Sequence, residues 1–169
     1  MTSVVPVAIV GVGDIGRGWA SLCVGAGWPV ALFDNSADAL EDAAPIIAGR
    51  ARSLVSLDRA DEATAEQGIA SLKVSRSLLQ ACGEAQWIIE CIGEDLPAKQ
   101  KLFEAFESTA PKARVVTSST SGFSVQDLAA RCRRPDRIVV AHPLNPPELI
   151  TLVELVPRPQ SDRALIEVL

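Results

Sequence analysis

Short apolar runs rich in β-branched residues alternate along the chain with longer segments of helical periodicity. Continuous apolar runs are typical of strands in parallel sheets, whose two faces are both covered by helices. The pattern predicts strands at 4–10, 30–34, 72–74, 87–92, 114–118, 137–142 and 149–156, and helices at 14–27, 37–57, 60–72, 76–82, 96–108 and 124–131. These repeated strand–helix units predict an α/β fold of Rossmann type, with a doubly wound, mostly parallel sheet.

Three residues bear on where the expected helices begin or are interrupted. Ser36 can cap the helix at 37–57, and Ser124, with an aspartate three residues later, resembles a capping box. Pro45 lies inside the first of these helices and lacks a backbone N–H, so we expect a kink or a break there.

Composition narrows the class of protein. Hydrophobic residues make up 48% of the 169 residues and charged residues 22%, which is typical of a folded domain. The net charge of −5 argues against nucleic acid or an anionic membrane as the main partner. The N-terminal apolar run lacks a basic region and breaks at glycines, so we expect neither a signal peptide nor a membrane span. The four cysteines form no CxxC pair, which predicts reduced thiols, no metal site and a cytoplasmic location.

A glycine-rich turn follows the first expected strand and opens the first expected helix. Gly11 allows the tight turn, Gly13 lets a pyrophosphate approach the backbone, and Gly16 lets the helix pack close to the sheet. Free N–H groups at the helix N-terminus would then attract the pyrophosphate. The turn therefore predicts a dinucleotide site. A purely structural turn and a methyltransferase-type nucleotide site are the alternatives.

Two acidic residues refine the prediction of a dinucleotide site. Asp34 ends the second expected strand, where its carboxylate would bind the adenosine ribose and repel a 2′-phosphate, so we expect NAD and not NADP. Asp14 stands at the start of the helix, where a negative charge is unfavourable for a pyrophosphate. We expect the Asp14 side chain to point away from the phosphates or to be offset by a cation, with Arg17 as the candidate.

The single histidine, His142, ends the strand expected at 137–142, and three prolines in the next five residues exclude a helix after it. We therefore expect His142 in a turn at the carboxyl end of a strand, where α/β sheets bind ligands. Glu154 lies in the last expected strand, which could return past this point. A carboxylate beside an imidazole orients the ring, as a general base in hydride transfer requires. From spacing alone, a structural histidine that caps a loop is equally compatible.

Five motifs occur in an order that resembles the NAD-binding domain of the L-3-hydroxyacyl-CoA dehydrogenase family: GVGDIGRGWA, LFD, IIECIGEDLPAKQKLF, SSTSGF and HPLNPPELITLVELV. The resemblance is greatest to the branch that contains L-gulonate 3-dehydrogenase (lambda-crystallin), L-carnitine dehydrogenase and bacterial diketoreductases. Members that act on acyl-CoA typically have Asn-Thr-Ser where this chain has Ser119-Thr120-Ser121. The resemblance therefore leaves open whether the substrate carries coenzyme A.

The resemblance implies an NAD-dependent oxidoreductase that transfers a hydride between the nicotinamide and a 3-hydroxy acid or 3-hydroxyacyl derivative. It matches His142 to the catalytic base, Glu154 to its acidic partner, and Ser121 to a serine that hydrogen-bonds the substrate hydroxyl. The cofactor-binding residues that it implies are Gly11, Gly13, Asp14, Ile15, Gly16, Asp34, Glu94, Lys99, Ser121 and Asn145.

Blander interpretations exist for some of these residues. Glu94 and Lys99 could be a solvated pair at a helix start, and Ser121 could merely shape its turn. Glu90, in an apolar strand, is expected to orient a loop rather than to catalyse.

Members of the family continue into an all-helical C-terminal domain that carries the dimer contacts and a wall of the substrate cleft. We therefore expect a dinucleotide-binding domain at 1–157, the start of a connection at 158–169, and a homodimer when the C-terminal domain is present. The chain alone should be a poor catalyst. Two other classes remain as alternatives: a non-catalytic, crystallin-like NAD-binding protein, and an interaction module with an inherited cofactor site.

Overall fold

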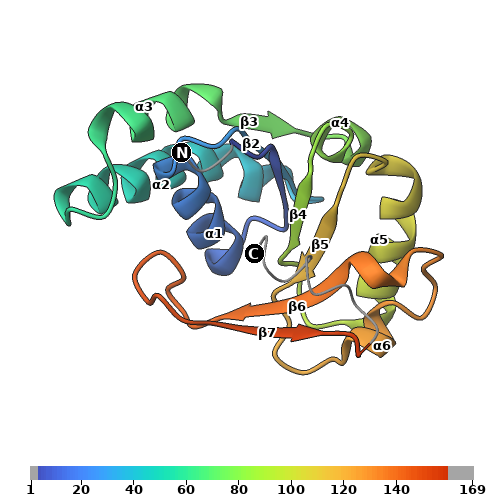
Figure 1. Cartoon of the computed structure of the whole chain (residues 1–169). Helices are drawn as coiled ribbons and strands as arrows, with labels where there is room; N and C mark the ends of the chain where they lie inside the picture. The colour runs from blue at the N-terminus through green and yellow to red at the C-terminus, as the bar shows by residue number, and fades with distance from the viewer. Residues whose placement is uncertain (1–3, 160–169) are drawn as a thin grey trace.

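The structure, a computed structural model, describes residues 4–159. These residues form a seven-stranded sheet in the order β3-β2-β1-β4-β5-β6-β7 (Figure 1). The strands are β1 (Val7–Val10), β2 (Val30–Phe33), β3 (Lys73–Ser75), β4 (Trp87–Glu90), β5 (Val115–Ser118), β6 (Ile138–Pro143) and β7 (Val153–Pro157). Neighbouring strands are parallel except β7, which pairs antiparallel with β6. The expected doubly wound, mostly parallel Rossmann-type sheet is confirmed.

Helices cover both faces of the sheet. They are α1 (Asp14–Gly25), α2 (Ala37–Ser56), α3 (Glu62–Ser71), α4 (Leu78–Cys82), α5 (Leu96–Thr109) and α6 (Val125–Leu128), with a 3₁₀ turn at Pro135–Arg137. In β1, Val7 and Ile9 pack with residues of α1 and α2, whereas Ala8 and Val10 pack with residues of α4, α5 and α6. Because β1 is buried on both faces, its sequence is continuously apolar. None of the helices within residues 4–159 is long and apolar enough to cross a bilayer.

The helix starts follow the capping residues. The Ser36 hydroxyl accepts a hydrogen bond from the Ala39 N–H, and the Ser124 hydroxyl accepts one from the Asp127 N–H, as expected. The break considered at Pro45 does not occur, because α2 continues through it. One face of α2 is buried on both sides of the proline, and this packing outweighs the lost backbone hydrogen bond.

The end of the sheet differs from the prediction. The strand expected from 149 begins only at Val153, because the N–H groups of Leu149 and Ile150 both donate to the Pro146 carbonyl in a turn. Strand β6 in turn extends through His142 to Pro143. His142 therefore lies within a paired strand, one residue before its end, and not in a turn. The loop at 144–152 joins β6 to β7.

Candidate active site

The site lies at the carboxyl ends of the parallel strands. The chain leaves β1 for β2 and β3 on one side and then returns to β4 on the other, so the strand order reverses between β1 and β4. Open α/β sheets bind ligands in the crevice at this point. A cavity of about 340 Å³, here called the central cavity, lies beside it. It is lined by Ile15, Cys91, Ile92, Gly93, Glu94, Lys99, Ser119, Ser121, His142, Pro143, Leu144 and Asn145.

Two further cavities adjoin the central cavity. The larger, of about 720 Å³ and here called the Asp34 cavity, shares Cys91, Ile92 and Gly93 with the central cavity and is also lined by Gly11, Gly13 and Asp34. The smaller, of about 120 Å³, lies on the Glu154 side of His142 and includes Ser121 and Phe123. The cavities thus form an elongated site that extends from the end of β2 to β7.

The glycine turn has the geometry that its sequence predicts. Gly11 has a φ of +96°, and a Cβ at this position would lie 2.6 Å from the Cys91 carbonyl carbon. A Cβ on Gly16 would lie 1.9 Å from the Gly11 carbonyl oxygen, so the first turn of α1 packs directly on the loop. A Cβ on Gly13 would meet no atom within 4 Å. Gly13 is also the N-cap of α1 and makes no side-chain cap, so the backbone here is open to an anion.

Asp34 lies where the sequence places it, directly after β2. Its two carboxylate oxygens accept hydrogen bonds from the backbone N–H groups of Val12 and Ser36, each at 2.9 Å. These bonds tie the end of β2 to the glycine turn. They also fix a negative charge in the wall of the Asp34 cavity.

The cation expected beside Asp14 was wrongly identified. Arg17 extends toward α2 and donates to the Ala39 carbonyl at 3.3 Å. The cation that contacts Asp14 is Arg50 of α2, whose Nη2 lies 3.4 Å from the Asp14 Oδ1. Nothing in the local sequence indicates this contact, because the two residues are 36 positions apart.

His142 and Glu154 meet across the antiparallel pair. The two residues are direct partners in the β6–β7 register, and the His142 Nδ1 lies 2.8 Å from the Glu154 Oε2. The His142 side chain is 30% exposed and lines the central cavity, whereas the Glu154 side chain is 67% exposed. Because Glu154 occupies Nδ1, a proton from a ligand would be taken at Nε2.

Lys99 is buried, so the interpretation of Glu94 and Lys99 as a solvated pair was wrong. The Lys99 side chain is 1% exposed, and its ammonium group donates to the Glu90 Oε1 at 2.7 Å and to the Ile92 carbonyl at 3.0 Å. The Glu94 Oε2 lies further away, at 3.5 Å. Burial raises the pKa of the Glu90 carboxyl, while the charge of Lys99 and hydrogen bonds from Lys99, Ser118 and the Ile92 N–H oppose that shift.

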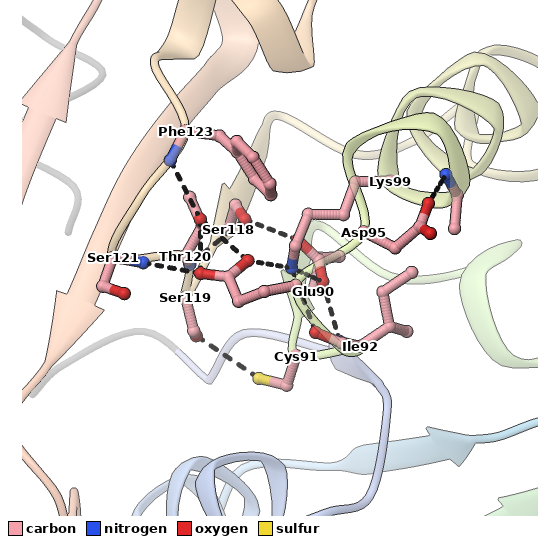
Figure 2. A network of polar contacts seen from close by, with 12 residues as sticks. Glu90, Cys91, Ile92, Asp95, Lys99, Ser118, Ser119, Thr120, Ser121 and Phe123 are labelled. Carbon is pink, nitrogen blue, oxygen red and sulfur yellow. Dashed lines mark hydrogen bonds and ion pairs between the residues drawn. The ribbon is translucent and has the colours of Figure 1, made fainter.

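This buried pair supports the loop after β5, as Figure 2 shows. The Ser118 hydroxyl donates to Glu90, and the Thr120 hydroxyl and the Ser121 N–H donate to Glu94 at 2.7 Å and 2.9 Å. Burial opposes ionisation of Glu94, but the hydrogen bonds from Thr120 and Ser121 and the nearby Lys99 charge together lower its pKa. Glu90 therefore orients loops at both β4 and β5, in the role that its position in an apolar strand predicts. The backbone N–H of Ser121 helps to shape the turn, and Ser121 also lines the central cavity.

The structure brings most of the predicted residues to one site. Ile15, Glu94, Lys99, Ser121, His142 and Asn145 line the central cavity, and Gly11, Gly13 and Asp34 line the Asp34 cavity. Asp14 and Gly16 line neither cavity and lie in the first turn of α1. No cluster of three potential metal ligands occurs within residues 4–159.

Several side chains of the site were not predicted. The Trp19 indole N–H donates to the Ser119 hydroxyl at 3.1 Å, and the Cys91 Sγ lies 3.3 Å from the same oxygen. The contact between Trp19 and Ser119 spans 100 positions of sequence. A single sequence contains no signal for contacts of this kind.

Comparison with known proteins places the site in a family. The family model described as "3-hydroxyacyl-CoA dehydrogenase, NAD binding domain" matches residues 6–169. L-carnitine dehydrogenase of Nocardiopsis dassonvillei is 34% identical over 161 residues, which cover 95% of this chain and 48% of that protein. The lambda-crystallin homolog of Homo sapiens is 34% identical over 162 residues, which cover 92% of this chain and 49% of that protein.

Solved structures show the same relationship. The 3-hydroxybutyryl-CoA dehydrogenase of Escherichia coli superposes with a TM-score of 0.86 at 30% identity, over 98% of this chain and 35% of that chain. The chain spans about half the length of the two curated relatives above. It therefore belongs to the 3-hydroxyacyl-CoA dehydrogenase family and corresponds to the NAD-binding domain of its members.

Proposed function

We propose that this chain is the cofactor-binding and proton-transfer part of an NAD-dependent dehydrogenase that acts on a 3-hydroxy acid or a 3-hydroxyacyl derivative. The observation that carries the proposal is the His142–Glu154 pair, with 2.8 Å between Nδ1 and Oε2. His142 lines the central cavity, which adjoins the cavity lined by Gly11 and Gly13. An oriented imidazole beside a dinucleotide site is the arrangement required for removal of a hydroxyl proton as a hydride leaves.

The residues of the site fit a dinucleotide. The open face of Gly13 and the N-terminus of α1 would hold the pyrophosphate, and Asp34 would bind the adenosine ribose in its own cavity. The nicotinamide would then reach the central cavity, past Ile15 and toward Glu94, Lys99, Ser121 and Asn145. When bound, it supplies the acceptor or donor of the hydride.

The side chains around the central cavity divide the remaining work. His142 would take the proton of the substrate hydroxyl at Nε2, and Glu154 would keep the ring oriented and stabilise the imidazolium that forms. The Ser121 hydroxyl would hydrogen-bond the same substrate oxygen. Glu94 would hold the Ser121 backbone in place, and Lys99 would in turn be fixed by Glu90.

The names of two relatives support the substrate class. L-carnitine dehydrogenase and 3-hydroxybutyryl-CoA dehydrogenase are the names of proteins at 34% and 30% identity, and the second name states a 3-hydroxy substrate. One of the two substrates carries coenzyme A, so we leave the acyl carrier unassigned. We further propose a cytoplasmic enzyme, a dinucleotide-binding domain at 1–157, and a homodimer in the complete protein. Apart from 158 and 159, the expected connection at 158–169 lies outside the described residues.

A titration and a turnover assay on the 169-residue chain test the proposal. We expect NADH to bind with saturable quenching of protein fluorescence, and His142→Asn to bind it equally well. Turnover should be slow, far below the rates of about 1–1000 per second typical of enzymes, because this chain would provide only part of a water-excluding cleft. His142→Asn should abolish what remains. Absence of NADH binding would contradict the proposed function, and unchanged turnover in His142→Asn would contradict the role of His142.

A further inference from the structure

The guanidinium of Arg50 joins two carboxylates that come from distant parts of the sequence, Asp14 and Glu148. Its Nη2 lies 3.4 Å from the Asp14 Oδ1, and its Nη1 lies 3.4 Å from the Asp14 carbonyl and 3.1 Å from the Glu148 Oε1. Asp14 begins α1, and Glu148 belongs to the loop between β6 and β7. Arg50 lines none of the three cavities, and the proposed function does not use it.

Asp14 stands at the end of α1 that the pyrophosphate would approach. It directly follows Gly13, the open N-cap residue. A carboxylate in the first turn is favourable for the helix alone, but it repels a second anion at the same N-terminus. The Asp14 side chain is 75% exposed, so packing does not fix its direction, and the cation that contacts it is Arg50.

Glu148 fixes the position of Arg50. Its side chain is 9% exposed, and the loop packs so closely on α1 that a Cβ on Gly18 would lie 2.6 Å from the Glu148 Oε2. Within residues 4–159 this Oε2 is buried and has no hydrogen-bond partner. A buried carboxylate needs a nearby cation, and the contact at 3.1 Å makes Arg50 that cation. The guanidinium is thus preorganised beside Asp14 before any ligand arrives.

We propose that Arg50 is a positioning residue for the dinucleotide, which screens the Asp14 carboxylate and holds it away from the pyrophosphate. The proposal rests on the proposed function, because it requires the pyrophosphate to bind at the glycine turn. Arg50 would then affect NAD binding although it is 36 positions from Asp14 in the sequence and is not expected to contact the cofactor.

The first test removes the cation. Arg50→Met should weaken NADH binding by about tenfold, because the Asp14 carboxylate would then repel the phosphates with only solvent to screen it. Adenosine has no phosphate, so its binding, followed by protein NMR shifts, should change by less than about twofold. Arg52→Met is the matched control. It lies on the same helix and removes an arginine whose exposed pair with Glu66, at 2.7 Å, does not contact Asp14.

The second test restores the balance of charge. Asp14→Asn in the Arg50→Met background should recover most of the NADH affinity, because the charge that Arg50 screened is then absent. In the wild-type background, Asp14→Asn should tighten NADH binding by less than about threefold, because Arg50 already screens the charge. Arg50→Lys keeps the positive charge and should retain NADH affinity within about threefold.

Three results would overturn the proposal. The first is NADH binding by Arg50→Met at the wild-type affinity. The second is a loss that Asp14→Asn does not restore, or an equal loss for adenosine, since either would indicate general damage to the fold. The third is a tenfold gain in NADH affinity from Asp14→Asn alone, which would show that Arg50 does not screen Asp14. This result would count against the proposal even if Arg50→Met fails to fold. Failure of the wild-type chain to bind NADH would instead contradict the proposed function.

Discussion

Replacing Lys99 by methionine would remove the ammonium group of a side chain that is 1% exposed and leave the carboxylate of Glu90, which is fully buried, without its cation. The two groups are 2.7 Å apart, and the Glu90 oxygens also accept hydrogen bonds from Ser118 and the Ile92 N–H. Those bonds would remain, but they cannot balance a full charge. Breaking a buried ion pair on one side typically costs about 3–5 kcal/mol, so we expect a loss of this size in the free energy of unfolding at neutral pH.

The loss should depend on pH in a definite direction. Burial already raises the pKa of Glu90, and removal of Lys99 takes away the main opposing charge, so the folded variant binds a proton that the unfolded chain has released. The extra proton on the folded state makes stability fall as pH rises, by up to about 1.4 kcal/mol per pH unit. This fall begins above the unfolded pKa of about 4.3 and ends above the raised folded pKa. Lys99→Met should therefore be less destabilised at pH 5 than at pH 8.

Urea denaturation at several pH values measures both effects, with two reference variants. Lys112→Met removes an exposed lysine that pairs with Glu84 at 2.6 Å, and it should cost less than about 1 kcal/mol. Lys99→Met combined with Glu90→Gln removes both charges, and it should recover much of the stability and lose the added pH dependence. If Lys99→Met cost no more than Lys112→Met, the reasoning about the buried pair would be refuted.

Four further predictions concern Asp34, the His142–Glu154 pair, the glycine turn and the thiols. Asp34→Asn should reduce the preference for NADH over NADPH, which we expect to be about tenfold to hundredfold in the wild type because of charge repulsion; equal affinities of the wild type for both cofactors would disprove the role of Asp34. Glu154→Gln should lower turnover by about tenfold or more and leave NADH affinity unchanged. An unaltered turnover rate would show that Glu154 does not assist His142 as a base. Gly16→Ala should lower the Tm markedly, because its Cβ would lie 1.9 Å from a backbone oxygen, whereas Gly13→Ala, whose Cβ meets nothing within 4 Å, should keep the Tm and weaken NADH binding; the opposite order would contradict the geometry of the turn. Burial raises the pKa of Cys91 to about 12 and also raises the pKa values of the other three thiols. A disulfide reagent at pH 8 should therefore react with the native chain at least about 100-fold more slowly than with the unfolded chain. Rapid labelling of the native chain would contradict this prediction.

The parts of the site that could be predicted are those that depend on residues close together in the sequence. The glycine turn depends on backbone geometry within a few residues, so the spacing of Gly11, Gly13 and Gly16 was sufficient to predict it. The contact between His142 and Glu154 could also be predicted, because the two residues are only 12 positions apart and β7 returns directly along β6. In both cases the residues that act together are close in the sequence.

The parts that could not be predicted depend on burial and on distant partners. Glu94 and Lys99 at a helix start look like a surface pair, and only the position of Glu90 in an apolar strand hinted that Lys99 is buried. Arg50 contacts Asp14 and Glu148 across 36 and 98 positions of sequence, and neither contact leaves a local pattern. The apolar run at 149–152 has the pattern of a strand, but periodicity does not reveal that the nearby turn uses the N–H groups of Leu149 and Ile150.

The order of the strands also constrains when the two halves of the site can form as the chain leaves the ribosome. Strand β1 is synthesised before the other strands of the sheet, yet it lies in the interior of the sheet, where Val7 pairs with Val30 and with Trp87. Gly11 packs on the Cys91 backbone, so the glycine turn gains its final support only after β4 has emerged. The β6–β7 pair that joins His142 to Glu154 is a contact of short sequence separation and needs little loop closure. The His142–Glu154 pair can therefore form soon after its own synthesis, while the glycine turn, although synthesised earlier, gains its support only after β4 has emerged.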